Sequence, residues 1–410
     1  MNNKARTAIA VLILSISVQI PAAAATERVY IGSYTAPADG AGPAPPVNHG
    51  EGIYMATFDS GTGTLSVPKL AARLSSPTWI VVNAKRDVLY AIDRFRGDVD
   101  KARASLPSMC HEGVAAVSAY VIDHASGALT FVNQVDAGGD SCHLAIDPKG
   151  KYLLSANYGD GSIAVLPIRE DGGLEPHTDL IHPTGPLHPD KPGDNPVQNY
   201  AYSSHTNSHV HMVGFDPSGR YVVANDAGLD KVLVFKSELD RGKLVPVATF
   251  DETPGSAPRH YAFSHDGRSF YNLLEQNSKL AVNSFNAETG AIIPRRKLSA
   301  LPAGFAGSSK ASEILAARNG RFLYAGNRVN DTIATFAIDA RGGARLLANT
   351  HTGADNPRSL AFDTTQQYLF SINQGGDSIT VFKLDPKTGL PMTPPQWVPV
   401  PSPTVMVFIE

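Results

Sequence analysis

The chain has 410 residues, of which 42% are hydrophobic and 18% charged, and its formal net charge is −3. Because the charges are nearly balanced and no stretch is strongly basic, the composition argues against a nucleic-acid partner. Beyond the N-terminal segment no apolar run approaches the ~20 residues needed to cross a bilayer, so we expect no membrane association after that segment is removed.

The N-terminal 25 residues have the pattern of a signal peptide. Lys4 lies in a positively charged start, an apolar run follows over 8–20, and small residues end at Ala25. This run is too short for a membrane-spanning helix, which favours cleavage near Ala25 over a retained anchor. We therefore predict a signal peptide over 1–25, a single domain over 26–410, and a periplasmic or secreted protein.

A repeated unit occupies the rest of the chain. Each copy has an apolar strand, a turn rich in Asp, Pro and Gly, a second strand, and a third strand of alternating apolar residues that leads to a Thr-Gly-Leu type of turn. Six complete copies begin near Pro77, Cys142, Val210, Pro258, Ala311 and Pro357. Repeats of this length and content are typical of the four-stranded blades of a β-propeller.

The two ends of the chain supply a seventh copy. Residues 28–33 and 52–58 lack a partner strand, which the tail over 404–409 can provide. This sharing closes the ring and removes an open sheet edge. We predict an all-β fold, a seven-bladed β-propeller of four-stranded antiparallel blades, closed by N- and C-terminal strands that share one blade.

The chain has two cysteines, Cys110 and Cys142. In an oxidising compartment they could form a disulfide, and two buried thiols are the alternative. Three histidines, His205, His209 and His211, lie close together in sequence and could bind a transition metal. No nearby carboxylate completes a recognisable ligand set, so we predict no metal site and no cofactor.

Ionisable residues recur where the blades should converge. In a propeller blade the start of the innermost strand and the end of the second strand lie at the same face. The residues at these positions are His143, His211, Arg259, His260, Glu313 and Arg358 at the strand starts, with Glu275 and Arg328 at the strand ends. Because buried charges are costly unless they are paired or used, the set predicts a functional site at the central channel. Hydrogen bonding between neighbouring blades is the alternative for any single residue.

Several motifs together resemble the lactonase family of seven-bladed propellers, which includes bacterial 6-phosphogluconolactonase and fungal carboxy-muconate cyclase. The matching segments are 29–35, 52–54, 258–263, 275–278, 311–314, 324–328 and 357–358. The resemblance covers essentially the whole mature chain. It implies a catalytic set of His211, Arg259 and Glu275.

The resemblance implies a lactone hydrolase that acts on a sugar lactone of the aldono or phosphoglucono type. We expect His211 or Glu275 to assist water attack on the carbonyl, and Arg259 to stabilise anionic groups. The expected substrate-binding residues are His143, His260, Glu313, Arg328 and Arg358. Export favours an unphosphorylated lactone, because phosphorylated sugar lactones are cytoplasmic metabolites. We expect a monomer whose partner is this small molecule.

Two alternatives stay open at this stage. One is a non-catalytic propeller that binds proteins or glycans in the envelope. The other is a muconate-type cycloisomerase, which would use the same base and arginines without net hydrolysis. Because a propeller fold alone does not imply a function, these functions can be distinguished only from the residues and geometry of the site.

Overall fold

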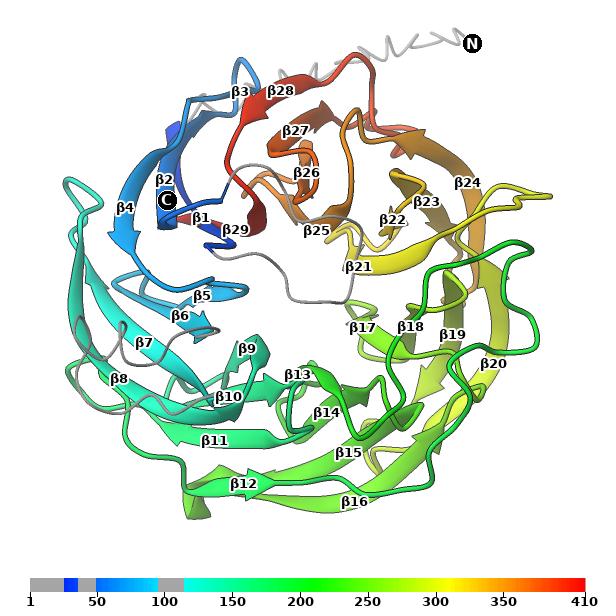
Figure 1. Ribbon diagram of the computed structural model, residues 1–410, viewed down its shortest axis with the longest axis horizontal. Coiled ribbons are helices and arrows are strands. Elements are labelled where there is room, and N and C mark those ends of the chain that lie inside the picture. Colours follow the sequence, from blue (N-terminus) through cyan, green and yellow to red (C-terminus); the bar gives the residue numbers. More distant parts are fainter. Residues whose placement is uncertain (1–25, 36–48, 95–113, 410) are drawn as a thin grey trace, which may run out of the picture.

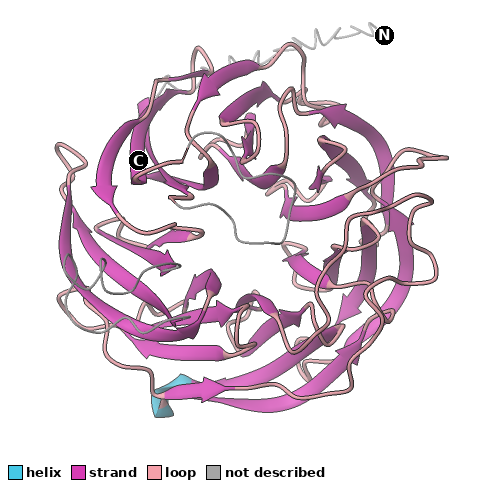
Figure 2. Ribbon diagram, viewed as in Figure 1, coloured by secondary structure: helices cyan, strands magenta, loops and turns pink. Residues whose placement is uncertain are grey.

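The computed structural model describes residues 26–35, 49–94 and 114–409. They form seven β-sheets arranged in a ring, and strands account for nearly all of the regular structure (Figures 1 and 2). Within these residues, the one helical segment is the 3₁₀ turn η1 (Leu239–Arg241), and no helix is long and apolar enough to cross a membrane. The predicted signal peptide over 1–25 lies outside the described residues.

Six sheets each contain four antiparallel strands in chain order, and the first strand lies nearest the ring axis (Figure 1). Blades 2, 3 and 4 consist of β5 (Ile80–Val82), β6 (Val88–Arg94), β7 (Val114–Ile122) and β8 (Leu129–Gly139); β9 (Ser141–Ile146), β10 (Tyr152–Asn157), β11 (Ile163–Pro167) and β12 (Asp179–Ile181); and β13 (Val210–Phe215), β14 (Tyr221–Asp226), β15 (Lys231–Glu238) and β16 (Lys243–Asp251).

Blades 5, 6 and 7 follow the same plan. They consist of β17 (Pro258–Phe263), β18 (Ser269–Leu274), β19 (Lys279–Phe285) and β20 (Ile292–Ser299); β21 (Lys310–Ala316), β22 (Phe322–Arg328), β23 (Thr332–Ile338) and β24 (Ala344–His351); and β25 (Pro357–Phe362), β26 (Tyr368–Asn373), β27 (Ser378–Lys383) and β28 (Gln396–Pro399). The repeats predicted from the sequence therefore correspond to blades.

The first blade closes the ring as predicted. Its strands are β29 (Pro403–Ile409), β1 (Thr26–Ser33), β2 (Gly52–Asp59), β3 (Thr64–Leu65) and β4 (Lys69–Arg73). The tail strand β29 is innermost and pairs antiparallel with β1, with Arg28 opposite Ile409. The short strands β3 and β4 both pair with β2 and together form the outer strand of this blade.

Apolar side chains fill the spaces between neighbouring sheets. Between blades 3 and 4, for example, Leu154 and Val165 pack in one buried cluster with Val213 and Phe235. Tyrosines on second strands add hydrogen bonds from one blade to the next, each donated to a carbonyl in the turn before the fourth strand: Tyr30 to Gly127 at 2.7 Å, Tyr90 to Gly172 at 2.9 Å and Tyr324 to Gly389 at 2.6 Å. These contacts fix the blades relative to one another at the face that holds these turns.

At the opposite face, bulges interrupt the starts of the innermost strands. In β13, β17, β21 and β25 the pairing register with the second strand shifts within the first residues. The residues left out of the pairing are His211, Arg259, Ser312 with Glu313, and Arg358. A bulge bends the strand and changes the direction of a side chain. The side chains of these residues therefore do not follow the regular alternation between the two faces of the sheet.

Candidate functional site

Glu275 forms the centre of a buried charge cluster at the face with the bulges. It follows β18 and is 6% exposed. Its Oε2 lies 2.9 Å from Nη1 of Arg259 and 2.6 Å from Nη2 of Arg328, and its Oε1 lies 2.9 Å from Nζ of Lys310. The hydroxyl of Ser203 also donates to Oε1 at 2.8 Å. Three cations from two blades therefore surround one carboxylate.

These cations determine the protonation of Glu275. Burial by itself would raise the pKa of the carboxyl, but Arg328, Lys310 and Arg259 together hold it well below its usual value. The carboxylate is thus ionised at neutral pH and has hydrogen-bonding or ionic partners on both oxygens. An anion held in this way is a weak base, and it is well suited to fix the positions of the cations.

Arg259 connects Glu275 to His211. Its Nε donates to the carbonyl of Ser312 at 3.0 Å, and its Nη1 contacts Nε2 of His211. Burial, followed by the charge of Arg259, keeps the pKa of His211 well below its usual value, so the imidazole is neutral. Because an arginine can only donate, His211 Nε2 accepts and Nδ1 carries the proton. Among the described residues, this Nδ1 has no hydrogen-bond partner.

A second group of buried side chains lies beside the first. Nδ1 of His260 is 2.8 Å from Oε1 of Glu313. The rings of Trp79 and His143 are 4.3 Å apart, and each lies 5.5 Å from the ring of His260. Because these residues come from blades 2, 3, 5 and 6, their side chains meet near the ring axis. The rings of His260 and His211, 5.0 Å apart, join the two groups.

Arg358 stands at the edge of this arrangement. Its Nη1 is 3.5 Å from Oε1 of Gln374, and its guanidinium lies 5.1 Å from the centre of the Tyr34 ring. No carboxylate of the described residues lies within ion-pair distance of Arg358. The structure therefore brings seven of the eight residues singled out from the sequence into two touching groups, and places Arg358 beside them.

Two members of the charge cluster were missed by sequence reasoning. Lys310 is the first residue of β21, one position before the repeat was expected to begin, and its position next to Ala311 was the available signal. Ser203 lies in the long insertion before β13, which has no counterpart in the repeat. Gln276 holds this insertion in place, accepting from the backbone NH of Ser203 at 2.6 Å and donating to the carbonyl of Ala201 at 2.8 Å.

The three histidines near residue 208 point to different partners. His205 lies 3.3 Å from the buried Asp230, and Nδ1 of His209 lies 2.7 Å from the carbonyl of Tyr158. His211 contacts Arg259 instead. Within the described ranges, no group of three or more His, Cys, Asp or Glu residues is placed to hold a metal ion.

Cys142 lies at the start of β9, where its sulfur is 3.3 Å from the carbonyl oxygen of His211. The disulfide considered from the sequence would join it to Cys110. Because Cys110 lies outside the described residues, that pairing stays a prediction.

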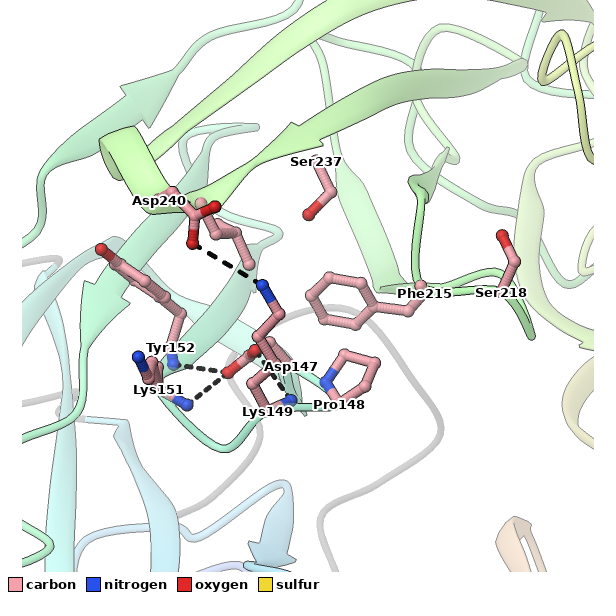
Figure 3. Close-up of a pocket in the computed structure, with 11 residues that line it drawn as sticks. Asp147, Pro148, Lys149, Lys151, Tyr152, Phe215, Ser218, Ser237 and Asp240 are labelled. Carbon is pink, nitrogen blue, oxygen red and sulfur yellow. Dashed lines mark hydrogen bonds and ion pairs between the residues drawn. The ribbon is translucent and has the colours of Figure 1, made fainter.

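A pocket of about 160 Å³ opens at the other face of the ring, between blades 3 and 4 (Figure 3). Lys149 and Asp240 form a 3.6 Å ion pair across it, and both side chains are largely exposed. Asp147 accepts hydrogen bonds from the backbone of its own turn, including one of 2.7 Å from Tyr152. Since its charges are solvated or already paired, this pocket has none of the unpartnered buried groups found at the other face.

Comparison with known proteins places the chain in a family. The model of the family described as lactonase, 7-bladed beta-propeller, matches residues 28–408. A 6-phosphogluconolactonase of Bacillus subtilis is 31% identical over 384 residues, which is 93% of this chain and 98% of that protein. The similarity therefore spans nearly the whole of both chains.

Solved structures agree with this assignment. The periplasmic gluconolactonase of Pseudomonas aeruginosa has a TM-score of 0.79 and 28% identity, covering 94% of this chain and 99% of that one. A protein from Lactobacillus plantarum has the same TM-score and identity, covering 94% of this chain and 100% of that one. Fold, motifs and family model lead to one conclusion: the chain belongs to the lactonase family of seven-bladed β-propellers.

Proposed function

We propose that the chain hydrolyses a sugar lactone at the cluster around Glu275. The observation that carries this proposal is the gathering of Arg259, Lys310 and Arg328 around a single carboxylate. One negative charge cannot neutralise three positive ones, so the cluster keeps an excess of positive charge. That excess suits a reaction in which negative charge develops on a carbonyl oxygen.

In this mechanism water attacks the lactone carbonyl and the ring C–O bond breaks. The arginines stabilise the oxyanion, and Glu275 holds them in position for it. His211 presents a neutral Nδ1–H that can donate to the substrate. The catalytic set is thus His211, Arg259 and Glu275, of which Glu275 acts on the cations and not on water.

The proposed substrate is an aldonolactone without a phosphate group, and the proposed location is the periplasm. The signal-peptide pattern of residues 1–25 supports export. The similarity to a protein named as a periplasmic gluconolactonase supports both points, and the similarity to a 6-phosphogluconolactonase supports the sugar lactone class. The proposed substrate-binding residues are His143, His260, Glu313, Arg328 and Arg358.

A panel of aldonolactones, followed by proton release with the purified mature chain, tests the proposal. We expect turnover of at least one lactone, and a fall in kcat/KM of about 10²-fold or more in Arg259→Ala, as for the loss of one oxyanion donor. The matched control is Arg321→Ala, because Arg321 donates to the carbonyl of Lys387 at the opposite face. Absence of turnover with every lactone would favour the binding-propeller alternative.

A further inference from the structure

The two bases considered from the sequence are both engaged in other contacts. Glu275 has a charged partner on each carboxylate oxygen. The lone pair of His211 Nε2 faces the guanidinium of Arg259. A group in either state is poorly placed to take a proton from water, so the proton acceptor should be sought elsewhere in the site.

His260 has the geometry that these two lack. One ring nitrogen, Nδ1, is held by Glu313 at 2.8 Å, while Nε2 is buried and has no partner among the described residues. Glu313 is itself fixed by the backbone NH of Ile314 at 3.1 Å. An imidazole oriented by a carboxylate through one nitrogen and free at the other is the arrangement of a general base.

The location of this pair connects it to the cations. His260 directly follows Arg259 in β17, and Glu313 directly follows Ser312, whose carbonyl accepts from Arg259 at 3.0 Å. Both pairs of neighbours lie at bulges, where the regular alternation of side chains is broken. Because Arg259 contacts His211, whose ring lies 5.0 Å from that of His260, a carbonyl polarised by Arg259 would lie near the His260 ring.

We propose that His260 is the general base of the lactonase reaction and that Glu313 is its positioning residue. This role rests on the lactone hydrolysis proposed above. As a water oxygen bonds to the carbonyl carbon, Nε2 takes one proton from the water and the carbonyl π electrons move to oxygen. When the tetrahedral intermediate collapses, the ring C–O bond breaks and Nε2–H returns the proton to the departing oxygen. Lactone and water thus give a hydroxy acid.

The electrostatics of the pair agree with this role. Burial raises the pKa of Glu313 to about 7, although nearby His143 and the arginines oppose the shift. Burial, followed by Arg259, keeps the pKa of His260 well below its usual value, so the ring is neutral at pH 7 and one ring nitrogen carries a lone pair. The charged and titratable groups that face the pair are His143, His211, Arg259, Glu275, Arg328 and Arg358.

The pH dependence follows from the sign of these shifts. Below a pH of about 7 Glu313 is protonated and neutral, so it stabilises the imidazolium of His260 poorly. Above this pH Glu313 is a carboxylate, whose negative charge stabilises the imidazolium. We therefore expect kcat to fall as the pH drops below about 7. Glu275 titrates well below its usual range and gives no such limb.

The test compares Glu313→Gln with wild type on the best lactone of the panel, over pH 5 to 9. We expect kcat to fall by about 10²-fold or more with KM nearly unchanged, and the limb near pH 7 to disappear. The matched control is Glu252→Gln, because Glu252 is an equally buried carboxylate whose partners, Lys297 and Asn272, are not among the site residues. This control should keep the wild-type pH profile. His260→Gln should lose activity as Glu313→Gln does, and it replaces that variant if Glu313→Gln does not fold.

The outcomes separate the two proposals. If Arg259→Ala is inactive while Glu313→Gln or His260→Gln keeps the wild-type kcat and pH limb, the general-base role is wrong and the lactonase proposal stands. A rise in KM with unchanged kcat in these variants would likewise overturn the role, because it indicates substrate binding alone. A wild type that hydrolyses no lactone would overturn both proposals.

Discussion

The two faces of the propeller are built from the same repeated unit, yet they differ in how far their polar atoms are hydrogen-bonded. At the face with the Asp-rich turns, carboxylates accept hydrogen bonds from backbone NH groups of their own turns: Asp147 from that of Tyr152 at 2.7 Å, Asp216 from that of Tyr221 at 2.8 Å and Asp363 from that of Tyr368 at 2.7 Å. At the face with the bulges, the buried polar atoms that lack a partner among the described residues include His143 Nδ1, His211 Nδ1, His260 Nε2, Glu313 Oε2 and Arg328 Nε.

This difference separates stability from function. Buried polar atoms are nearly always hydrogen-bonded, so buried atoms without a partner need an explanation. One explanation is that they form hydrogen bonds to a bound substrate. At the turn face the Asp carboxylates are satisfied within their turns and tyrosines link the blades, and the buried Glu27 Oε1, whose partner oxygen accepts from Thr364, is an exception. The bulge face leaves donors and acceptors available to a ligand. Variants at the two faces should therefore differ in whether they affect folding, activity or both.

The largest loss of stability is expected from removing β29, the innermost strand of the first blade, which runs from one face of the propeller to the other. Deletion of residues 404–410 removes all of β29 except Pro403, and with it the buried side chains of Val405, Met406, Phe408 and Ile409. Each is worth about 1.5–3 kcal/mol when buried, and together they approach the whole stability of a typical domain. We expect aggregation or a large loss of melting temperature. A truncated chain that melts like wild type would contradict the closure by β29.

The next largest effect is expected at the bulge face itself. Glu275→Gln removes the one anion from among Arg259, Lys310 and Arg328, and uncompensated buried charge costs about 3–5 kcal/mol. Because the folded-state pKa of Glu275 is lowered, its contribution to stability is present above the usual glutamate pKa of 4.5 and is lost as the pH falls. Denaturant unfolding should thus show a deficit at pH 7 that narrows toward pH 3. We also expect activity to fall, because the cations lose their anchor. Equal stability at pH 7 with unchanged activity would mean that Glu275 does not hold the cations.

The smallest effect is expected at the turn face. Tyr324→Phe removes the 2.6 Å hydrogen bond to the carbonyl of Gly389 between blades 6 and 7 and keeps the packed ring. We expect a loss of about 1 kcal/mol in the free energy of unfolding, with kcat/KM unchanged. A change in kcat/KM comparable to that of Arg259→Ala would show that the two faces are coupled, and the separation of their roles would then be wrong.

Much of the fold was predictable because the copies of the repeat can be compared with one another within the chain. Six copies of one pattern and two terminal half-copies are enough to predict the blades and the closure by β29. The gathering of His211, Arg259 and Glu275 was also predictable, since blade topology places strand starts and second-strand ends at one face. The innermost strand of blade 2, β5, starts at Ile80, shortly after the expected start near Pro77.

The chemistry within the site was less predictable for two physical reasons. Bulges decide where Arg259 and Glu313 point, and a pattern of residue types does not reveal a register shift. The role of Glu275 depends on how many cations reach it. One of these, Lys310, lay just outside the expected repeat, and Ser203 came from an insertion without any repeat.

The pairing of β29 with β1 also bears on the order of folding. Arg28 and Ile409 are neighbours in the sheet, although nearly the whole chain separates them in sequence. Contacts between such distant residues carry the greatest loop-closure entropy, and topologies rich in them fold slowly. Blades 2 to 7 each consist of consecutive strands and can form from local hairpins as soon as their residues are available. The first blade cannot be completed until the C-terminal strand β29 pairs with β1. We therefore expect ring closure to be the late, rate-limiting step of folding.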